Sequence, residues 1–432
     1  SRAAAGLQER VRDIPPARVG AVEQARTQLT AQTDELTALL NRVSTAADLL
    51  PSMLGGNSPR SYFVAFQTNA EARGTGGLVG AFGILRATGG AVSLDERAAN
   101  TGLADDPAAA VDLGADYAAL YPGTSPTGRW INSNFSPHFP NAGRIWTALW
   151  DEQSGQHLDG AIATDPVALS YVLGATGPIT LTGGETVTAD NVVALTESEV
   201  YARFDNNDAR KAFLQEISSA VVTQVLLADG STTALLSALG RAVDEGHIAV
   251  YSTHPEEQTK LAGAALGHQV PDDDAPYAAV VVNNASQGKL DYYLGRRISY
   301  AAGPCGAATR TSTVSATLTN HAPAAGLPAY VTIQAGSKNP GPPGTNASLV
   351  SLYATRGAQL EGVAVDGRPA GARVGGERGH PVFSLEVSLA PGATSTVTWT
   401  LREPAVAGTA RVPVQPLAAA ATVTDSVPPC RP

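Results

Sequence analysis

The residues of this sequence whose types and spacing suggest chemistry are a set of cations. Six of them recur in short, polar stretches punctuated by glycine: Arg73, Arg203, Arg210, Lys211, Lys289 and Arg296. The chain as a whole is acidic, with a net charge of -10 at pH 7, which argues against a general attraction to nucleic acid or acidic membranes. Cations gathered at one place would instead form a local anion site. Guanidinium groups match phosphate oxygens in pairs, so phosphate is the anion we expect.

One of these stretches, residues 69–77, carries Arg73 among alanines and glycines. Apolar runs with aromatic and β-branched residues lie on either side, at 62–66 and 78–85. Such runs, bounded by polar turns, are typical of core strands. We therefore expect Arg73 at the tip between two strands, where small neighbours let a ligand approach closely.

Arg203, Arg210 and Lys211 flank the expected start of a long amphipathic helix after Asn207. The first turn of a helix presents backbone N–H groups and the positive end of the helix dipole. A phosphate group there would gain from the helix as well as from the cations. The alternative is that Arg210 and Lys211 lie on a solvated helix face.

Lys289 stands two residues before Asp291, in a segment that we expect to be a strand. Residues two apart share one face of a strand. The alternatives for Lys289 are therefore a plain ion pair with Asp291 and a cation that faces the anion site.

Around these residues the sequence alternates strands and helices. Further strands are expected at 91–94, 157–164, 248–251 and 278–282, and helices at 107–120, 141–152, 188–204 in part, 231–245 and 254–266. Asp165 and Pro166 should start another helix, because Asp is a good N-cap and Pro suits the first turn. This alternation predicts an α/β fold in which helices layer a mixed sheet.

From about residue 309 the pattern changes to alternating apolar and polar residues. Strands are expected at 313–319, 329–334, 348–353, 360–365, 382–389 and 395–401, with a Pro/Gly-rich loop at 338–344 and an extended tail after Pro404. Such short strands predict a C-terminal β-sandwich. The 432 residues then divide into an N-terminal amphipathic helix (1–56), an α/β domain (57–305) and a β-sandwich domain with its tail (306–432).

The two cysteines, Cys305 and Cys430, lie near the start and the end of the last region. No metal-ligand spacing of His or Cys lies beside them. In an oxidising compartment we expect them to form a disulfide bond. Two buried thiols are the alternative.

Residues 17–50 carry apolar residues at helical spacing. The chain begins at Ser1 without an initiator Met and contains no run of 18 apolar residues, so we expect an ectodomain without its own membrane span. The opening helix would then be membrane-proximal and continue from a removed anchor. An ordinary amphipathic helix packed on the domain is the alternative.

Five motifs together resemble an actinobacterial extracytoplasmic family known only as domain of unknown function 4012. They are Asn-Ala-Glu-Ala-Arg-Gly-Thr-Gly-Gly at 69–77, Leu-Asp-Gly-Ala-Ile-Ala-Thr-Asp-Pro at 158–166, Leu-Gly-Ala-Thr-Gly-Pro at 173–178, Tyr-Ala-Arg-Phe at 201–204 and Gly-Lys-Leu-Asp-Tyr-Tyr-Leu at 288–294. The resemblance covers roughly residues 60–430. It implies no established activity.

The order of features is also similar, more distantly, to the LytR-CpsA-Psr family. These extracytoplasmic enzymes bind polyprenyl-pyrophosphate-linked glycans and transfer the glycan to the cell wall. Arg73, the segment Ile-Asn-Ser-Asn-Phe at 131–135, and Tyr201 to Arg203 with Arg210 match the family's segments in order. The resemblance implies a LytR-CpsA-Psr-like α/β domain in which these arginines bind the pyrophosphate.

From the residues and the resemblance together we assign the site. Arg73, Arg203, Arg210, Lys211 and Lys289 are the expected phosphate-binding residues. Glu71 and Arg73 are the expected catalytic residues, with Glu71 as a base or as a ligand of Mg²⁺ or another divalent cation. The chain departs from the enzyme family at 67–71, Gln-Thr-Asn-Ala-Glu, where the family has an aspartate, and the family's Pro-Arg-Asp segment has no clean counterpart near 94–97.

These departures leave three functions open. The first is binding of a polyprenyl (pyro)phosphate-linked glycan with phosphotransfer of the glycopolymer to the cell envelope, or hydrolysis of the pyrophosphate. The second is a non-catalytic polyprenyl-lipid or glycan-binding module in an envelope assembly. The third is a structural adhesion protein, which would bind no lipid.

Overall fold

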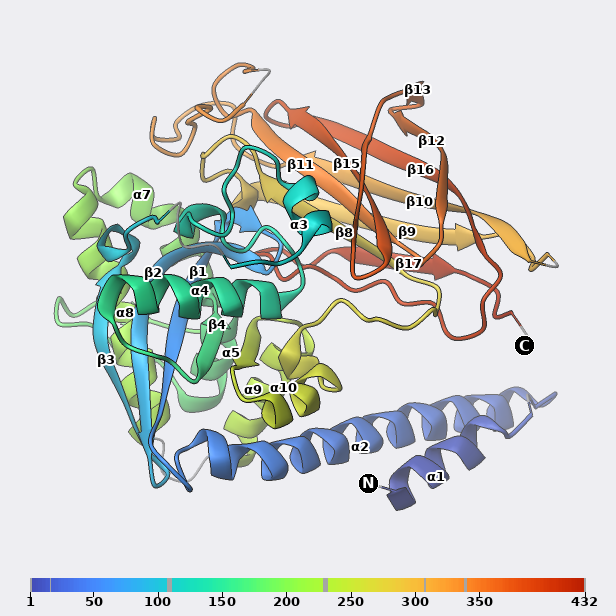
Figure 1. Ribbon diagram of the computed structural model, residues 1–432, viewed down its shortest axis with the longest axis horizontal. Coiled ribbons are helices and arrows are strands. Elements are labelled where there is room, and N and C mark those ends of the chain that lie inside the picture. Colours follow the sequence, from blue (N-terminus) through green and yellow to red (C-terminus); the bar gives the residue numbers. More distant parts are fainter. Residues whose placement is uncertain are drawn as a thin grey trace.

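The computed structural model describes residues 2–15, 17–106, 111–227, 232–306, 308–337 and 340–430. It is a mixed α/β structure with several sheets, as expected. Figure 1 shows a helical hairpin, a sheet covered by helices, and a region built mainly of strands.

The N-terminal hairpin consists of α1 (Arg2–Arg12) and α2 (Gly20–Met53). The last turns of α2 join the rest of the chain, where Leu49 and Met53 pack with Tyr62, Val250 and Leu261. The apolar residues that predicted this helix are instead exposed, by 36% to 56%: Val22, Leu29, Leu36, Leu40, Val43 and Leu50. Among the described helices, none combines the length and the apolar character that a membrane crossing requires.

The first sheet has five strands in the order β3-β2-β1-β4-β7. Their bounds are β1 (Arg60–Arg73), β2 (Gly76–Thr88), β3 (Ala91–Ala99), β4 (Gly160–Thr164) and β7 (Ile248–Ser252). β1 and β4 run parallel, and the other neighbours run antiparallel. Arg73 pairs with Gly76 at the tip of the β1–β2 hairpin, as the sequence predicted, and the register of β1 shifts between Thr68 and Ala72.

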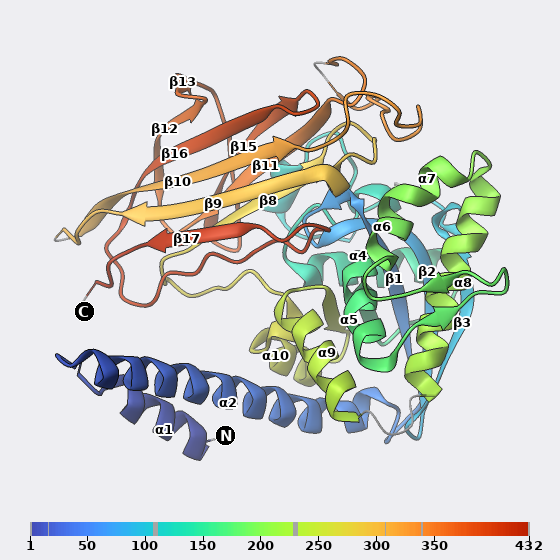
Figure 2. The ribbon, with the colours of Figure 1, turned by 180° about the vertical axis from the view of Figure 1, so that it is seen from behind.

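Helices cover both faces of this sheet. Figure 1 shows α4 on one face, and Figure 2, from behind, shows α5, α8 and α9 on the other. Their bounds are α3 (Ala115–Leu120), α4 (Phe139–Ser154), α5 (Pro166–Thr176), α6 (Val192–Ala194), α7 (Val200–Arg203), α8 (Asn207–Leu227), α9 (Thr232–Asp244) and α10 (Pro255–Ala262), with a π-helical turn at Leu195–Glu199 and a two-stranded ribbon of β5 (Ile179–Thr180) and β6 (Thr186–Val187).

Two local predictions about helices have different outcomes. The Asp165 carboxylate accepts hydrogen bonds from the backbone N–H groups of Val167 (3.0 Å) and Ala168 (3.1 Å), so it caps α5 as expected. The helix expected at 107–120 begins later, at Ala115, and residues 107–110 of that prediction lie outside the described residues.

The remaining strands form two larger sheets, which we call the two-sheet region. One has six strands in the order β13-β12-β16-β10-β9-β17, and the other has four in the order β14-β15-β11-β8. Their bounds are β8 (Ala278–Asn284), β9 (Leu294–Ala302), β10 (Thr309–Asn320), β11 (Asn346–Ala354), β12 (Gln359–Val365), β13 (Arg368–Pro369), β14 (Arg373–Glu377), β15 (His380–Leu389), β16 (Thr394–Pro404) and β17 (Thr422–Ser426). Both sheets contribute to one core, in which Trp399 packs with Val350 and Tyr300.

Two predictions about the strands of the two-sheet region are wrong. We placed residues 278–302 in the α/β domain (57–305), but β8 pairs with β11 and β9 pairs with β10, so both belong to the two-sheet region. The strand expected at 329–334 is a turn, because the Val331 N–H bonds to the Pro328 carbonyl and the Val331 carbonyl accepts from the N–H of Lys289.

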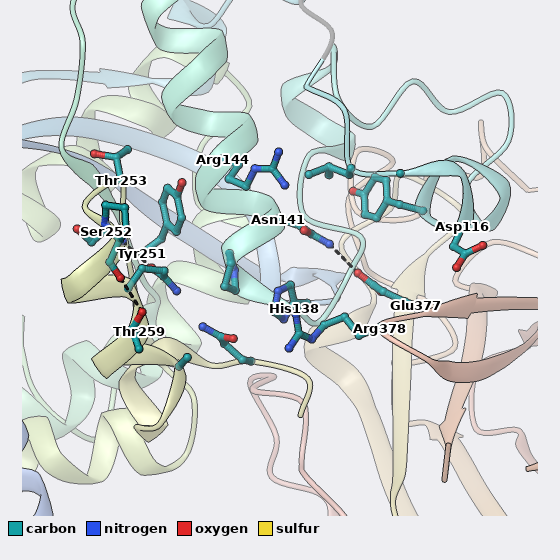
Figure 3. Close-up of a pocket in the computed structure, with 18 of the residues that line it drawn as sticks. Asp116, His138, Asn141, Arg144, Tyr251, Ser252, Thr253, Thr259, Glu377 and Arg378 are labelled. Carbon is teal, nitrogen blue, oxygen red and sulfur yellow. Dashed lines mark hydrogen bonds between the residues drawn. The ribbon is translucent and has the colours of Figure 1, made fainter. Parts of the chain in front are cut away.

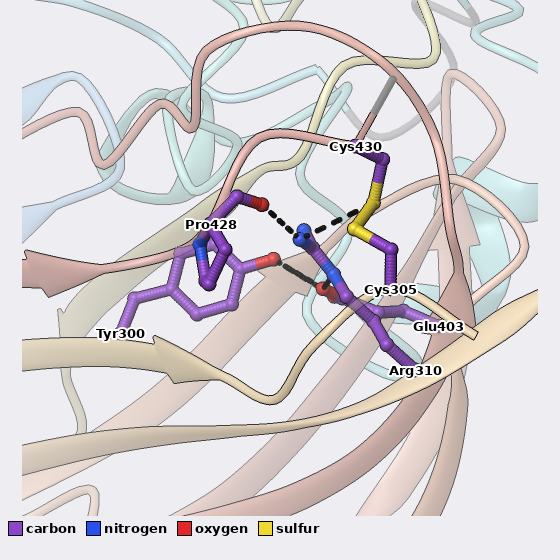
Figure 4. The surroundings of a disulfide bond; sticks show 6 residues. All are labelled: Tyr300, Cys305, Arg310, Glu403, Pro428 and Cys430. Atoms are coloured by element: carbon purple, nitrogen blue, oxygen red, sulfur yellow. Dashed lines mark hydrogen bonds and ion pairs between the residues drawn. A yellow bond between two sulfur atoms is a disulfide. The ribbon is translucent and has the colours of Figure 1, made fainter. Parts of the chain in front are cut away.

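The expected disulfide bond joins Cys305 to Cys430 and fastens the C-terminal tail. Beside it, Arg310 forms a fully buried ion pair with Glu403 (2.9 Å) and donates to the Pro428 carbonyl (2.8 Å) (Figure 4). The tail is therefore held by a covalent bond, by a hydrogen bond from the buried Arg310 and by the pairing of β17 with β9.

Candidate functional site

Four of the six predicted site residues line one pocket of about 140 Å³: Glu71, Arg210, Lys211 and Lys289. We call it the β1–α8 pocket, because it lies between the β1–β2 hairpin and the helices α5 and α8. Apolar side chains form part of its wall: Phe66, Leu78, Ala81, Leu169 and Leu214. The sequence therefore predicted most of this cluster but not its small volume.

Arg210 is held in the pocket wall by contacts on several sides. Its side chain donates to the Phe204 carbonyl (3.3 Å) and to Asn207 Oδ1 (2.6 Å). The guanidinium carbon lies 4.3 Å from the ring centroid of Tyr330 and 5.4 Å from that of Tyr201, within cation–π range. Arg210 is only 5% exposed, so the solvated-face alternative is wrong for this residue.

Lys289 lies across the same Tyr330 ring, with its ammonium 5.2 Å from the centroid. It forms an ion pair with Glu71, and not with Asp291 as one alternative proposed. Burial lowers the pKa of Lys289 to about 7. The strand that we expected at Lys289 and Asp291 is not present: Lys289 lies in a bend, and Asp291 belongs to a 3₁₀ turn before β9. Asp291 accepts hydrogen bonds from the Ala72 N–H and from two asparagines.

Lys211 extends from α8 towards the end of β3. Its ammonium donates to Asn100 Oδ1 and to Thr101 Oγ1, both at 3.2 Å. Partial burial lowers its pKa. Both partners are neutral, so these hydrogen bonds do not neutralise the positive charge of Lys211.

Arg73, which the sequence predicted to bind phosphate and to act in catalysis, does not line the pocket. Its guanidinium donates to the Ile131 carbonyl (3.0 Å) and to the Ala72 carbonyl (2.9 Å), and it lies over the Phe135 ring. Arg73 is 4% exposed, and burial lowers its pKa to about 10. Arg73 thus contacts the segment 131–135 inside the protein and is not offered to a ligand in the pocket.

Two other cations also lie away from the pocket. Arg203 forms an ion pair with Glu185 (2.6 Å), with 44% of its side chain exposed, and stacks on Phe204 and Phe213. Arg296 is buried and donates to the carbonyls of Gln415 and Ala419 in the tail. Arg203 was expected in the site, but at the end of α7 its side chain pairs with Glu185 outside the pocket.

The start of α8 contributes less to an anion site than we expected. Asn206 Oδ1 accepts hydrogen bonds from the N–H groups of Asp208 (2.8 Å) and Ala209 (3.0 Å). These two amide groups are therefore capped by a side chain and are not offered to a ligand. The positive charge of the pocket comes from its side chains.

Glu197 lines the pocket and was missed in the sequence. It lies in the π-helical turn before α7, a kind of bulge that is frequent at functional sites. Its carboxyl group accepts from Thr68 Oγ1 (2.8 Å) and from the Ala70 N–H (2.6 Å), where the register of β1 shifts. Burial raises the pKa of Glu197 to about 7 despite these bonds.

Tyr330, which contacts both Arg210 and Lys289, was missed because its segment looked like a strand. No local sequence signal identifies a turn that is fixed by a bond from the Lys289 N–H. Glu197 had a weak signal, since it is an acidic residue close before the Tyr-Ala-Arg-Phe motif at 201–204.

Residues 57–201 match the model of a protein family of unknown function, DUF4012. The match confirms the resemblance over residues 57–201, which contain four of the five strands of the first sheet, β1 to β4, and the helices α3 to α6. It includes Glu71, Glu197 and Tyr201 of the pocket, whereas Arg210, Lys211 and Lys289 lie beyond it. No curated protein matches the chain.

Two solved structures show weak similarity to the chain. A "putative nutrient binding protein" from Legionella pneumophila has 11% identity and a TM-score of 0.20 over 32% of this chain and 48% of that one. The Lin1025 protein from Listeria innocua has 13% identity and a TM-score of 0.23 over 52% and 85%. The chain thus spans about half of the Legionella protein. At these TM-scores neither similarity supports a conclusion about fold or function.

Proposed function

We propose that the β1–α8 pocket binds the phosphate head group of a polyprenyl-phosphate-type lipid, which makes this chain an extracytoplasmic lipid- or glycan-carrier-binding module of the cell envelope. The observation that carries the proposal is the meeting of Arg210, Lys211 and Lys289 at one pocket with a partly apolar wall. A cationic end beside an apolar surface suits a ligand with an anionic head and a hydrocarbon tail.

The charges in the pocket favour an anion. Glu71, Asp165 and Glu197 are also in its wall. The first two carboxylates are already engaged, and burial raises the pKa of Glu197 to about 7, so that Glu197 is partly protonated near neutral pH. Glu71 pairs with Lys289, while Asp165 caps α5 and contacts His247 Nδ1 (2.6 Å). Arg210 and Lys211 are held by neutral oxygen atoms and keep their charge for a ligand.

The volume limits how much of the lipid the pocket can hold. A cavity of about 150 Å³ accommodates a molecule the size of benzene, and this pocket measures about 140 Å³. It therefore suits a phosphate group with the first carbons of an isoprenoid chain. The rest of the chain would leave along the apolar side of the wall, past residues such as Leu169 and Leu214.

Phosphotransfer is a second candidate, and Glu197 is the observation that favours it. A carboxyl group with a pKa of about 7 in a pocket is suited to accept a proton from an acceptor hydroxyl. Glu71, the expected catalytic carboxylate, would first have to leave Lys289 to bind Mg²⁺ or to act as a base. Glu197 is the better supported base, and Arg73 supports the hairpin rather than the chemistry.

The finer fold and location are part of the proposal. We infer that the first sheet with its helices is a LytR-CpsA-Psr-like domain, and that the two-sheet region is a β-sandwich appended to it. The bond between Cys305 and Cys430 suits an oxidising, extracytoplasmic compartment. The helix α2 would then lie next to the membrane anchor.

Calorimetric titration with farnesyl phosphate tests the binding proposal, with farnesol and inorganic phosphate as comparison ligands. We expect farnesyl phosphate to bind tightest, and Arg210→Gln to weaken its binding about tenfold or more, because a hydrogen bond to a charged group contributes about 1.5–3 kcal/mol. Arg203→Gln is the matched control and should change nothing. Equal losses in both variants, or equal affinity for farnesol, would contradict the proposal.

The transfer candidate needs a separate measurement. With a polyprenyl-pyrophosphate-linked glycan and Mg²⁺, Glu197→Gln should abolish release or transfer while farnesyl phosphate still binds. If the wild-type protein binds the lipid but shows no turnover, its function is that of a non-catalytic lipid-binding module.

A further inference from the structure

A larger cleft, of about 840 Å³, lies on the opposite face of the first sheet from the β1–α8 pocket. Its walls come from the starts of α3 and α4, the end of β7, α10, and the turn between β14 and β15. Figure 3 shows side chains from both regions of the chain facing this space: His138, Asn141, Arg144, Tyr251, Glu377 and Arg378. The cleft therefore lies at the junction of the first sheet and the two-sheet region.

Two polar groups in the wall of this cleft are buried without a partner among the described residues. They are the hydroxyl of Tyr117, a residue that is 3% exposed, and Nε2 of Gln258. The other end of the Gln258 amide is fixed, because its Oε1 accepts from the Ser252 N–H (2.9 Å). A buried polar group left unsatisfied costs about 1–3 kcal/mol. Because both atoms expose almost no surface, a ligand with hydroxyl groups reaches them only when the side chains that cover them shift.

The wall also holds polar groups in fixed orientations. Glu377 is 4% exposed and accepts from Ser136 Oγ (2.7 Å), Asn141 Nδ2 (2.6 Å) and the Tyr353 hydroxyl (2.8 Å). The Asn141 amide is thereby held with its N–H towards Glu377, which turns its carbonyl oxygen the other way (Figure 3). The cleft thus has an oriented acceptor as well as donors.

His138 adds a further oriented group. Burial lowers its pKa to about 3, so its ring is neutral near pH 7. Nδ1 accepts from the Val270 N–H (3.3 Å), which leaves the ring proton on Nε2. His138 is therefore a neutral donor in the cleft wall.

Two arginines bring positive charge from different elements. Arg144 extends from α4, is exposed, and donates to a neutral group, the Asp112 carbonyl (3.0 Å). Arg378 lies at the β14–β15 turn, where its Nε donates to the Val270 carbonyl (2.8 Å) and its Nη2 forms an ion pair with Asp272 (3.4 Å). Guanidinium groups bind carboxylates in pairs of hydrogen bonds. The acidic Asp116 at the start of α3 lies on the side of the cleft away from Tyr251 (Figure 3).

We propose that this cleft is a binding site for an acidic saccharide. Sugar hydroxyl groups both donate and accept, so they can satisfy the Tyr117 hydroxyl, Gln258 Nε2 and the Asn141 carbonyl together. A carboxylate on the sugar pairs with Arg144, whose charge is not matched by an acidic partner among the described residues, while Arg378 keeps its ion pair with Asp272. The site is independent of the β1–α8 pocket, so either proposal can fail alone, and Arg210→Gln leaves saccharide binding unchanged.

Titration of the intact protein with hexagalacturonate and with neutral chitohexaose tests this proposal. Hexagalacturonate should bind more tightly than chitohexaose. Tyr117→Phe removes one hydroxyl and should weaken binding about fivefold, while the melting temperature stays the same or rises because an unsatisfied polar group is lost. Arg144→Gln should remove the preference for the acidic sugar, and Arg368→Gln on β13 is the control.

Each other outcome overturns the proposal. No binding of hexagalacturonate at millimolar concentration excludes a saccharide of this class. Equal affinity for the two sugars excludes the role of Arg144. Unchanged binding in both Tyr117→Phe and Arg144→Gln places the sugar elsewhere, and a lowered melting temperature of Tyr117→Phe shows that a buried water, rather than a sugar, satisfies the hydroxyl.

Discussion

Arg203 and Arg210 stand seven residues apart, yet one faces solvent and the other forms the wall of the β1–α8 pocket. Both lie beside the same helix start, so residue type and spacing predicted an anion-binding role equally for both. Their difference depends on their partners: Arg203 pairs with Glu185 and stays partly exposed, whereas Tyr330, which comes from a distant segment, covers Arg210. A sequence can place cations near a site, but it does not show which of them a later segment buries.

Glu197 should make the stability of the fold depend on pH. Its pKa rises from 4.5 to about 7 on folding because of burial. A carboxyl group with a raised pKa stabilises the fold fully below the unfolded value, and loses that contribution as pH rises through about 7. Chemical denaturation between pH 5 and 8 should therefore show a decline of about 2.5 kcal/mol from this group.

In Glu197→Gln that decline should be absent, because the amide has no proton to lose. Thr68→Ser is a conservative comparison, since it keeps the hydroxyl that donates to Glu197. An unchanged pH profile in Glu197→Gln would show that the carboxyl group is ionised throughout this range.

At the scale of elements, the β1–β2 hairpin was predictable and the turn at 329–334 was not. The hairpin follows from two apolar runs around a Gly-rich tip, and its strands satisfy each other's backbone bonds. The segment 329–334 has the same composition as a strand, but its backbone bonds go to Pro328 and Lys289. The residue types of this segment favour a strand, but its hydrogen bonds to other parts of the chain stabilise a turn instead.

The tip of the hairpin depends on Gly74. A Cβ atom there would lie 2.2 Å from the Phe135 carbonyl oxygen, which belongs to backbone and cannot easily move. Gly74→Ala should therefore cost about 1–3 kcal/mol in the free energy of unfolding. Gly80→Ala in the same hairpin meets its nearest atom at 3.5 Å and should change stability far less; equal losses in the two variants would mean that the tip is not docked.

The two ends of α2 should respond differently to truncation. Leu49 is 2% exposed in a cluster with Tyr62 and Leu261, so Leu49→Ala should cost about 2–5 kcal/mol. Leu36 is 45% exposed, and Leu36→Ala should stay within about 0.5 kcal/mol. Urea denaturation measures both, and a large loss in Leu36→Ala would show that this stretch of the helix is covered in solution.

At the scale of the whole molecule, the sequence distinguished an α/β part from a later β part but misplaced their boundary. All seven residues of β8 are buried, and the first five are apolar. Such an apolar run is typical of a buried strand in either kind of sheet, so it does not show which sheet contains the strand. Which sheet takes the strand is decided by pairing with β11, some seventy residues later in the chain. The disulfide bond was predictable, because only two cysteines exist and both lie in the same region.

Reduction of the disulfide bond should destabilise the two-sheet region. The bond joins residues 125 apart, and closing a loop of that length contributes about 5 kcal/mol in the chain-entropy model. The melting temperature should therefore fall on adding a reductant. The double variant Cys305→Ser and Cys430→Ser should melt at the lower temperature with or without reductant, and no difference from wild type would mean that the tail is held by Arg310 and β17 alone.

The most direct measurement of lipid binding is photo-crosslinking with a farnesyl phosphate analogue that carries a diazirine on its first isoprene unit, followed by peptide mapping. Binding in the β1–α8 pocket predicts labels on residues 66–81 and 207–218, and loss of those labels in Arg210→Gln. Labels confined to the exposed side of α2, or labels that persist unchanged in Arg210→Gln, would contradict it.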